Sequence, residues 1–206
     1  MPVREGQAVG RRRRRTPEAA QREIIAAAEQ LLRERPFREL TVDEVMRRTG
    51  LSRPSFYVYF KDRHDLVLRL VQHLASEMLV VANRWYEAAE PSPAMLREAL
   101  EGSIEVYGEH SAVLRALADA AVDDPQVEEA HGQLVSGFVE ITARHIEVQV
   151  AAGRMLPMHP TETAKAMIWM VERYLYHAFG PTNPVPPGRV LDTVHTIMVR
   201  TLYGEK

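Results

Sequence analysis

The sequence has no cysteine among its 206 residues and only two tryptophans. The lack of cysteine excludes disulfides, thiolate nucleophiles and zinc or iron–sulfur sites that depend on Cys ligands. No segment approaches 18 consecutive apolar residues, so the sequence predicts no membrane-spanning helix. The basic N-terminus is not followed by the apolar segment of a secretory signal. We therefore expect a cytoplasmic protein without a membrane partner.

Catalytic and metal-binding motifs are also missing. The eight histidines, from His64 to His195, are at least nine positions apart, so there is no His-x3-His zinc pair. The sequence contains neither a phosphate-binding loop nor a Gly-rich dinucleotide fingerprint. We predict no enzyme, no metal and no cofactor. A catalytic triad assembled in space stays open, although no motif indicates one.

Charge is unevenly distributed along the chain. Residues 1–63 contain 15 Lys/Arg against 9 Asp/Glu, whereas the remainder contains 11 against 19. A basic first third favours contact with a polyanion. Most of the excess comes from one run, Arg11, Arg12, Arg13, Arg14 and Arg15, in a stretch without apolar periodicity. We expect residues 1–18 to form a disordered basic arm, with a solvated tail of no function as the alternative.

Helical patterns follow this arm. Apolar residues recur at i, i+3, i+4, i+7 and i+8 from Ile24 to Leu32, and Pro36 ends the first predicted helix. Thr41 and Glu44 have the spacing of a capping box, which opens a second short helix that ends near Gly50. Asp62 is a suitable N-cap for a long helix over about 63–88.

The segment Phe56–Phe60 is aromatic or β-branched at every position, and local propensity alone favours a strand. Ser52 is a natural N-cap, however, and Pro54 is tolerated in a first helical turn but not in a central strand. We therefore predict a third short helix. Phe56 and Phe60 would share its core face, while Tyr57 would share another face with Arg53 and Pro54.

Beyond residue 63, polar and Pro/Gly-rich breaks divide the chain into about six helices, of which the helix over about 63–88 is the first. Those breaks lie near 91–93, 109–111, 123–125, 153–160 and 180–187. No convincing strand or repeat is present. The predicted fold is all-α with about nine helices: a three-helix head over 19–65 and a helical bundle over 66–206.

Three short helices with a tight turn before the third are typical of a helix-turn-helix, whose third helix enters the major groove of DNA. The stretches Thr41-Val42-Asp43-Glu44-Val45 and Gly50-Leu51-Ser52-Arg53-Pro54-Ser55-Phe56-Tyr57-Val58-Tyr59-Phe60-Lys61-Asp62-Arg63 resemble the DNA-binding signature of the TetR family of one-component regulators. The resemblance covers residues 20–70. Arg63 stands where that family commonly has a lysine, and either cation can meet a phosphate.

The resemblance implies a role for each matching position. Arg53 would reach a guanine edge, and Pro54 and Tyr57 would contact thymine methyl groups. Phosphate contacts are implied for Thr41, Ser55, Tyr59, Lys61 and Arg63. The arginine arm would enter the neighbouring minor groove. For Tyr57 and Tyr59, core packing is the alternative.

The larger half is similar to the EthR-like branch of that family, which contains the ethionamide repressor. This similarity rests on short motifs, among them Gly108-Glu109-His110-Ser111-Ala112-Val113, Glu172-Arg173 and Val190-Leu191-Asp192-Thr193. It implies a homodimer through helices over about 161–179 and 187–203, and an elongated apolar pocket. The implied lining is Leu100, Ser103, Ile104, Tyr107, Leu117, Leu134, Val135, Phe138, Thr142, Trp169, Met170, Glu172, Arg173, Tyr176 and Met198.

Two positions depart from that repressor: Val171 replaces an asparagine that hydrogen-bonds ligands, and Met198 replaces a tryptophan. The effector therefore need not be the same, and plain core packing is the alternative for the whole set. Glu172 and Arg173 can also form a purely structural pair.

The prediction for function is a dimeric regulator, expected to be a repressor, that binds a near-palindromic operator and is released by a hydrophobic small molecule. Activation stays open. The rival hypothesis is an architectural DNA-binding protein that needs no effector.

Overall fold

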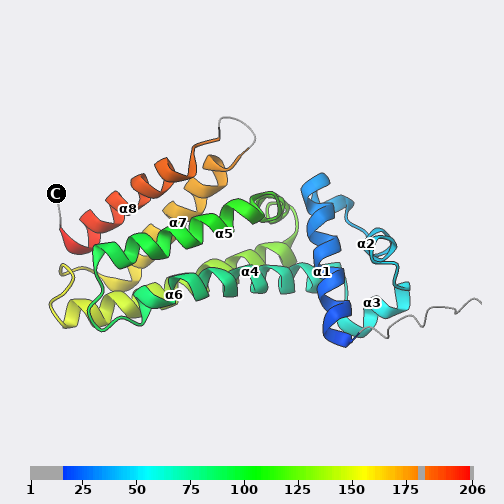
Figure 1. Ribbon diagram of the computed structural model, residues 1–206, viewed down its shortest axis with the longest axis horizontal. Coiled ribbons are helices and arrows are strands. Elements are labelled where there is room, and N and C mark those ends of the chain that lie inside the picture. Colours follow the sequence, from blue (N-terminus) through cyan, green and yellow to red (C-terminus); the bar gives the residue numbers. More distant parts are fainter. Residues whose placement is uncertain (1–15, 181–183, 205–206) are drawn as a thin grey trace, which may run out of the picture.

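A computed structural model describes residues 16–180 and 184–204. Within these residues it contains eight α-helices, one short 3-10 helix and no strand, which confirms the all-α prediction with one α-helix fewer than expected (Figure 1). The elements are α1 (Pro17–Glu34), η1 (Phe37–Glu39), α2 (Val42–Thr49), α3 (Arg53–Tyr59), α4 (Arg63–Tyr86), α5 (Pro93–Ala120), α6 (Pro125–Ala151), α7 (Pro160–Ala178) and α8 (Pro187–Tyr203).

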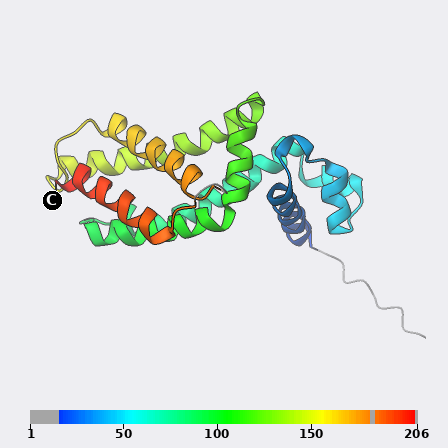
Figure 2. The same ribbon diagram turned by 90° about the horizontal axis from the view of Figure 1, so that it is seen from above.

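The helices form a small head and a larger body. Figures 1 and 2 place α1, α2 and α3 at one end of an elongated molecule and the bundle of α4 to α8 at the other. The helix α4 starts beside the head and runs into the bundle, so it belongs to both parts. None of the helices in the described residues is long and apolar enough to cross a membrane.

The first helix starts earlier than the apolar pattern suggested. The Thr16 hydroxyl accepts a hydrogen bond from the Ala19 amide at 3.2 Å, and Pro17 occupies the first turn. The predicted stripe from Ile24 to Leu32 is buried, and the helix ends at Glu34, two residues before Pro36. The predicted arginine arm, Arg11 to Arg15, lies outside the described residues.

Local capping signals produce the turn between α2 and α3. The Thr41 hydroxyl accepts from the Glu44 amide at 3.3 Å, and Gly50 ends α2 in the left-handed region at φ 65°. Residues 53–59 then form a helix, which excludes the strand suggested by propensity. Ser52 holds the N-cap position of α3, although its hydroxyl lies 2.7 Å from the Ser55 hydroxyl and does not bond a backbone amide.

The predicted break at 109–111 is wrong, because α5 is continuous from Pro93 to Ala120. Figure 2 shows that this helix changes direction in its second half. Gly108 directly precedes the predicted break, and the Ser111 hydroxyl donates to the Gly108 carbonyl at 3.0 Å. Gly and Ser positions that bond back to the preceding turn are known to bend helices. The sequence therefore marks a bend and not an end.

Candidate nucleic-acid interface and internal cavity

The two faces of α3 differ sharply in burial. Phe56 and Phe60 are 0% and 1% exposed, and their ring centroids are 5.3 Å apart in the core of the head. On the other side, Arg53 and Pro54 are exposed and Tyr57 is 51% exposed. The phenylalanines therefore anchor a short helix that presents an arginine and a tyrosine ring to solvent. This is the arrangement predicted from the sequence.

The guanidinium of Arg53 is held across the turn. Its Nη1 donates to Asp43 Oδ2 on α2 at 3.1 Å, and its Nη2 donates to the Tyr57 hydroxyl at 3.4 Å. Both members of the Arg53–Asp43 pair are more than half exposed, so solvent screens the attraction. The contacts position the arginine over α3 without burying it, which leaves its donors accessible to a ligand.

Four other predicted contact residues lie in α3 or next to α2 and α3 in the sequence. Thr41 and Lys61 are exposed at the N-terminus of α2 and just after α3, while Ser55 and Tyr59 are half-buried. The Thr41 hydroxyl donates to Glu44 Oε2 at 2.8 Å, and the Lys61 amide donates to Asp65 Oδ2 at 3.0 Å. Thr41 and Lys61 are therefore open to solvent, Ser55 is partly so, and Tyr59 also packs against the core of the head.

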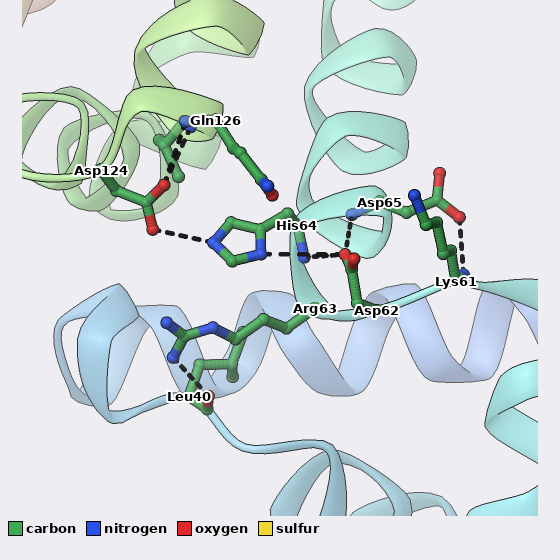
Figure 3. A network of polar contacts seen from close by, with 9 residues as sticks. Leu40, Lys61, Asp62, Arg63, His64, Asp65, Asp124 and Gln126 are labelled. Atoms are coloured by element: carbon green, nitrogen blue, oxygen red, sulfur yellow. Dashed lines mark hydrogen bonds and ion pairs between the residues drawn. The ribbon is translucent and has the colours of Figure 1, made fainter.

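Arg63 does not join them. Its Nη1 donates to the Leu40 carbonyl at 3.4 Å (Figure 3) and to the Arg38 carbonyl at 3.3 Å. Its guanidinium lies 4.8 Å from the Phe37 ring centroid. This cation is folded against η1, where it satisfies the last carbonyls before α2. Its role in the described conformation is to join α4 to the head.

Sequence reasoning missed two exposed cations on the head. The Arg38 side chain is 82% exposed on η1, and Arg47 is exposed in the last turn of α2. Both lie within the charge-rich first third of the chain. The excess of basic residues in this part of the chain was the only sequence signal for exposed cations. It does not show which arginines form ion pairs within the protein, as Arg35 does with Glu44 at 2.5 Å.

An apolar cavity of about 150 Å³ lies inside the body, among α4, α5, α6, α7 and α8. A cavity of this size is large enough for a ring-sized apolar group. Nine of the fifteen predicted residues line it: Leu100, Ser103, Tyr107, Leu117, Leu134, Val135, Phe138, Glu172 and Met198.

Six predicted residues do not line this cavity, for three reasons. Ile104 and Thr142 are buried beside it, and the Thr142 hydroxyl lies 3.0 Å from the hydroxyl of Tyr86. Tyr176 and Met170 are only half-buried, and the Tyr176 hydroxyl donates to Asp119 at 2.5 Å. Trp169 and Arg173 point outward, with Trp169 45% exposed.

The contribution of α4 to the cavity wall was not predicted from the sequence. Val67, Val71, Met78, Ala82 and Trp85 line the cavity from this helix. Their spacings of four, seven, four and three residues place them on one face, so the signal was present. A second apolar stripe on the same helix includes the buried residues Leu66, Leu70 and Leu74. Because both stripes are apolar, the sequence alone does not show which one faces the cavity.

Polar groups are few in the cavity wall. The Ser103 hydroxyl donates to the Ala99 carbonyl at 2.8 Å. Burial raises the pKa of Tyr107 well above its usual range, and the nearby Glu172 carboxylate raises it further. Glu172 Oε1 lies 3.3 Å from His131 Nε2, and both side chains are largely buried. The wall is therefore mainly apolar, with one acidic position on α7.

Two histidine–carboxylate contacts tie the head to the body. His64 Nε2, at the start of α4, lies 2.8 Å from Asp124 Oδ2, and Asp124 also caps α6 through the Gln126 and Val127 amides (Figure 3). This hydrogen bond holds the pKa of Asp124 below its usual range. His110 Nδ1 on α5 lies 2.6 Å from Glu29 Oε1 on α1. These contacts join α6 to the start of α4 and join α5 to α1.

Comparison with known proteins matches both parts of this architecture. Residues 24–70 match the model of bacterial regulatory proteins of the TetR family, and residues 96–204 match that of the C-terminal domain of transcriptional regulator EthR. The HTH-type transcriptional regulator EthR of Mycobacterium tuberculosis is 35% identical over 206 residues, covering 94% of this chain and 93% of that protein. EthR of Mycolicibacterium smegmatis is 30% identical, covering 94% and 91%.

Solved structures agree on the fold. A putative TetR-family regulator from Syntrophomonas wolfei superposes with a TM-score of 0.80 at 14% identity, covering 90% of this chain and 95% of that one. One from Rhodococcus sp. gives 0.75 at 19% identity, covering 89% and 98%. The relatives are transcriptional regulators and not enzymes. With a helix-turn-helix head, an EthR-type C-terminal domain and relatives similar over nearly its whole length, this chain belongs to the TetR family of transcriptional regulators.

Proposed function

We propose that this regulator is a homodimeric repressor whose two α3 helices read the half-sites of a near-palindromic operator. It would act in the cytoplasm on the DNA of the nucleoid, and an apolar molecule in the cavity would release it. The observation that carries the proposal is the exposed Arg53–Tyr57 face of α3, anchored by Phe56 from beneath. An arginine and an aromatic ring at the start of a short exposed helix suit readout of base edges.

The other proposed contacts would fix the position of the head along the DNA. Ser55 and Tyr59 on α3, Thr41 before α2 and Lys61 after α3 would bind phosphates, with the arginine arm in the adjacent minor groove. A phosphate contact by Arg63 would require its guanidinium to leave the carbonyls of Arg38 and Leu40. Arg63 is therefore the weakest member of the proposed interface.

The uncovered faces of α7 and α8 support dimerisation through these helices. Trp169 on α7 is 45% exposed and Ile197 on α8 is 41% exposed, and both helices lie at one side of the body (Figure 1). Large apolar side chains at the solvent face of adjacent helices favour burial against a second copy. A two-fold dimer through this face would present two heads to DNA.

Release would proceed through α4. One end of this helix carries Arg63 and His64 against η1 of the head, and its later turns carry Ala82 and Trp85 in the cavity wall. An effector that binds best to a conformer with wrongly spaced heads would shift the population away from DNA. Equal affinity for both conformers would shift nothing.

The replacement Arg53→Ala tests base readout. It should weaken operator affinity by about 1–3 kcal/mol and relax specificity at one base pair of each half-site. Arg84→Ala is the matched control, because Arg84 is 72% exposed at the far end of α4. Binding to the DNA flanking its gene and to single-base variants would be measured by fluorescence anisotropy. An unchanged sequence profile in R53A would remove Arg53 from the reading role.

Footprinting separates this proposal from an architectural DNA-binding protein. A dimeric regulator should protect one site with half-sites a helical turn, or a multiple of one, apart. An architectural protein should show salt-sensitive affinity without sequence preference.

Deletion of residues 1–15 tests the arm. Each arginine that neutralises a phosphate contributes about 0.9 to the slope of log K against log salt, so the truncated protein should bind more weakly and with a shallower slope. Replacing Arg11 to Arg15 by serine at full length separates charge from chain length. If both proteins keep the native slope of log K against log salt concentration, the arm does not contact the DNA.

A further inference from the structure

One hydroxyl group in the cavity wall has no hydrogen-bond partner. Three residues with hydroxyl groups line the cavity, namely Tyr86, Ser103 and Tyr107. The Tyr86 hydroxyl lies 3.0 Å from that of Thr142, and the Ser103 hydroxyl donates to the Ala99 carbonyl. The Tyr107 hydroxyl forms no hydrogen bond within the described residues. Buried polar groups are rarely left without a partner, so this hydroxyl needs an explanation.

The side chains of the wall that carry an N–H group already have partners. Trp85 Nε1 donates to the Tyr203 hydroxyl at 3.3 Å, and His131 Nε2 lies 3.3 Å from Glu172 Oε1. With the proton of a neutral imidazole on Nε2, facing this carboxylate, the other ring nitrogen of His131 is an acceptor. Among the described residues of the wall, the Tyr107 hydroxyl is therefore the donor that a ligand can use.

The position of Tyr107 suits a contact with a ligand. Tyr107 is 6% exposed and belongs to the cavity wall, and its oxygen, unlike Glu172 Oε2, is not fully enclosed by protein atoms. The cavity is therefore the space that this oxygen can reach. The Tyr107 ring on α5 lies 5.8 Å from the ring of Phe179, which directly follows α7. A ligand oxygen at this hydroxyl would lie where α5 meets the end of α7.

Tyr107 remains protonated, and a neutral phenol can donate one hydrogen bond. Burial and the Glu172 carboxylate raise the pKa of Tyr107 above its usual value, and they outweigh the opposing effect of Arg115 and Arg173. Neither arginine lines the cavity, whereas Glu172 does. Within the described residues the wall thus contains an acidic group and no arginine or lysine. An anionic ligand is disfavoured in such a cavity, because its charge would lose water without gaining a cation.

We propose that the effector is an uncharged, mainly apolar molecule with a carbonyl oxygen, and that the Tyr107 hydroxyl donates a hydrogen bond to this oxygen. The inference rests on the proposed effector role of the cavity. The apolar body of the ligand lies against the lining side chains of α4 and α6, and its carbonyl oxygen faces α5. A hydrocarbon of the same shape would leave the hydroxyl without a partner, so Tyr107 favours ketones, esters and amides.

Three ring-sized probes of nearly the same shape isolate the acceptor: acetophenone, α-methylstyrene and benzoate. The first has a ketone oxygen, the second has a methylene group in its place, and the third has a carboxylate instead of the acetyl group. Binding to the full-length protein is measured by calorimetry, and release of the DNA flanking its gene by anisotropy. Benzoate should bind most weakly, because its charge must leave water for an apolar cavity that contains a carboxylate.

The replacement Tyr107→Phe removes only the hydroxyl. It should lower the affinity for acetophenone relative to that for α-methylstyrene by about threefold to tenfold, the contribution of one neutral hydrogen bond. Comparing this ratio between the native protein and the variant cancels any change that affects both ligands alike. Tyr174→Phe is the matched control, because Tyr174 is half-buried on α7 and does not line the cavity. It should keep the native ratio.

The carbonyl stretch of isotope-labelled acetophenone provides a second measurement, on the native protein. A hydrogen bond weakens the C=O bond, so the infrared frequency of the bound ketone should lie below its value in hexane. This shift should disappear in Y107F and persist in Y174F. If Y107F does not fold, the frequency in the native complex still decides whether the ketone accepts a hydrogen bond in the cavity.

The possible outcomes separate this inference from the proposed function. An unchanged affinity ratio in Y107F, or a native carbonyl frequency equal to that in hexane, would overturn the inference and leave the effector role of the cavity intact. Tighter binding of benzoate than of acetophenone would contradict an uncharged effector. If none of the probes binds, or if they bind without releasing DNA, the effector role of the cavity is wrong and the inference fails with it.

Discussion

Phe56→Ala should lower the free energy of unfolding by about 3–5 kcal/mol, because it removes a fully buried ring from the small core of the head. The Phe56 ring packs 5.3 Å from that of Phe60, and little else in a three-helix head can close the space. The change should abolish operator binding. Urea denaturation followed by circular dichroism measures the loss, with anisotropy on operator DNA as the second measurement.

Tyr57→Ala is the matched control on the same helix. Tyr57 is 51% exposed, so its removal should change the free energy of unfolding by less than about 1 kcal/mol while still weakening operator binding. Equal destabilisation by both changes would mean that Tyr57 packs in the core. That result would contradict the division of α3 into an anchored face and a reading face.

The head was predictable because its signals are local. Thr41, Gly50 and Asp62 each cap a helix through bonds to residues at most four positions away, and the structure has all three. The helical assignment of α3 followed from Pro54, which overrides the strand propensity of the residues after it. Because short-range contacts determine where these helices begin and end, the spacing of residues in the sequence was sufficient to predict them.

The misread break in α5 has a tertiary cause. Residues 109–111 are polar and look like a loop in isolation. In the fold, Arg33 donates to the Glu109 carbonyl at 3.3 Å, and His110 pairs with Glu29 on α1. The polar residues belong to the contact between helix and head. No local pattern distinguishes such a contact from a break, since the partners lie about 80 positions away in the sequence.

The cavity lining was only partly predictable for a related reason. On α7, Ile168, Val171 and Leu175 face the cavity while Trp169 faces solvent, and all four are apolar. Periodicity identifies apolar positions but does not distinguish a cavity wall from an exposed apolar face. The same ambiguity applies to α4, where the apolar pattern does not tell which of two stripes lines the cavity. Packing among distant helices decides which stripe meets which surface.

Ser103→Trp should abolish the effector response while leaving operator affinity within about threefold. Ser103 is half-buried in the cavity wall on α5, and its hydroxyl bonds only to the Ala99 carbonyl of its own helix. An indole at this position would occupy the space that a ligand needs. Because a cavity of about 150 Å³ can take up part of the indole, the cost of overpacking should stay within about 1–3 kcal/mol.

The measurement is DNA release at increasing concentrations of an effector that acts on the native protein, with thermal unfolding of each variant recorded alongside. Glu105→Trp provides the control: it adds the same side chain two residues along α5, at an exposed position. That variant should keep both DNA binding and release. If S103W unfolds while E105W does not, the side chains around Ser103 are packed as ordinary core. That result would contradict the proposed binding of an effector in the cavity. If S103W still releases DNA, the effector binds elsewhere in the body.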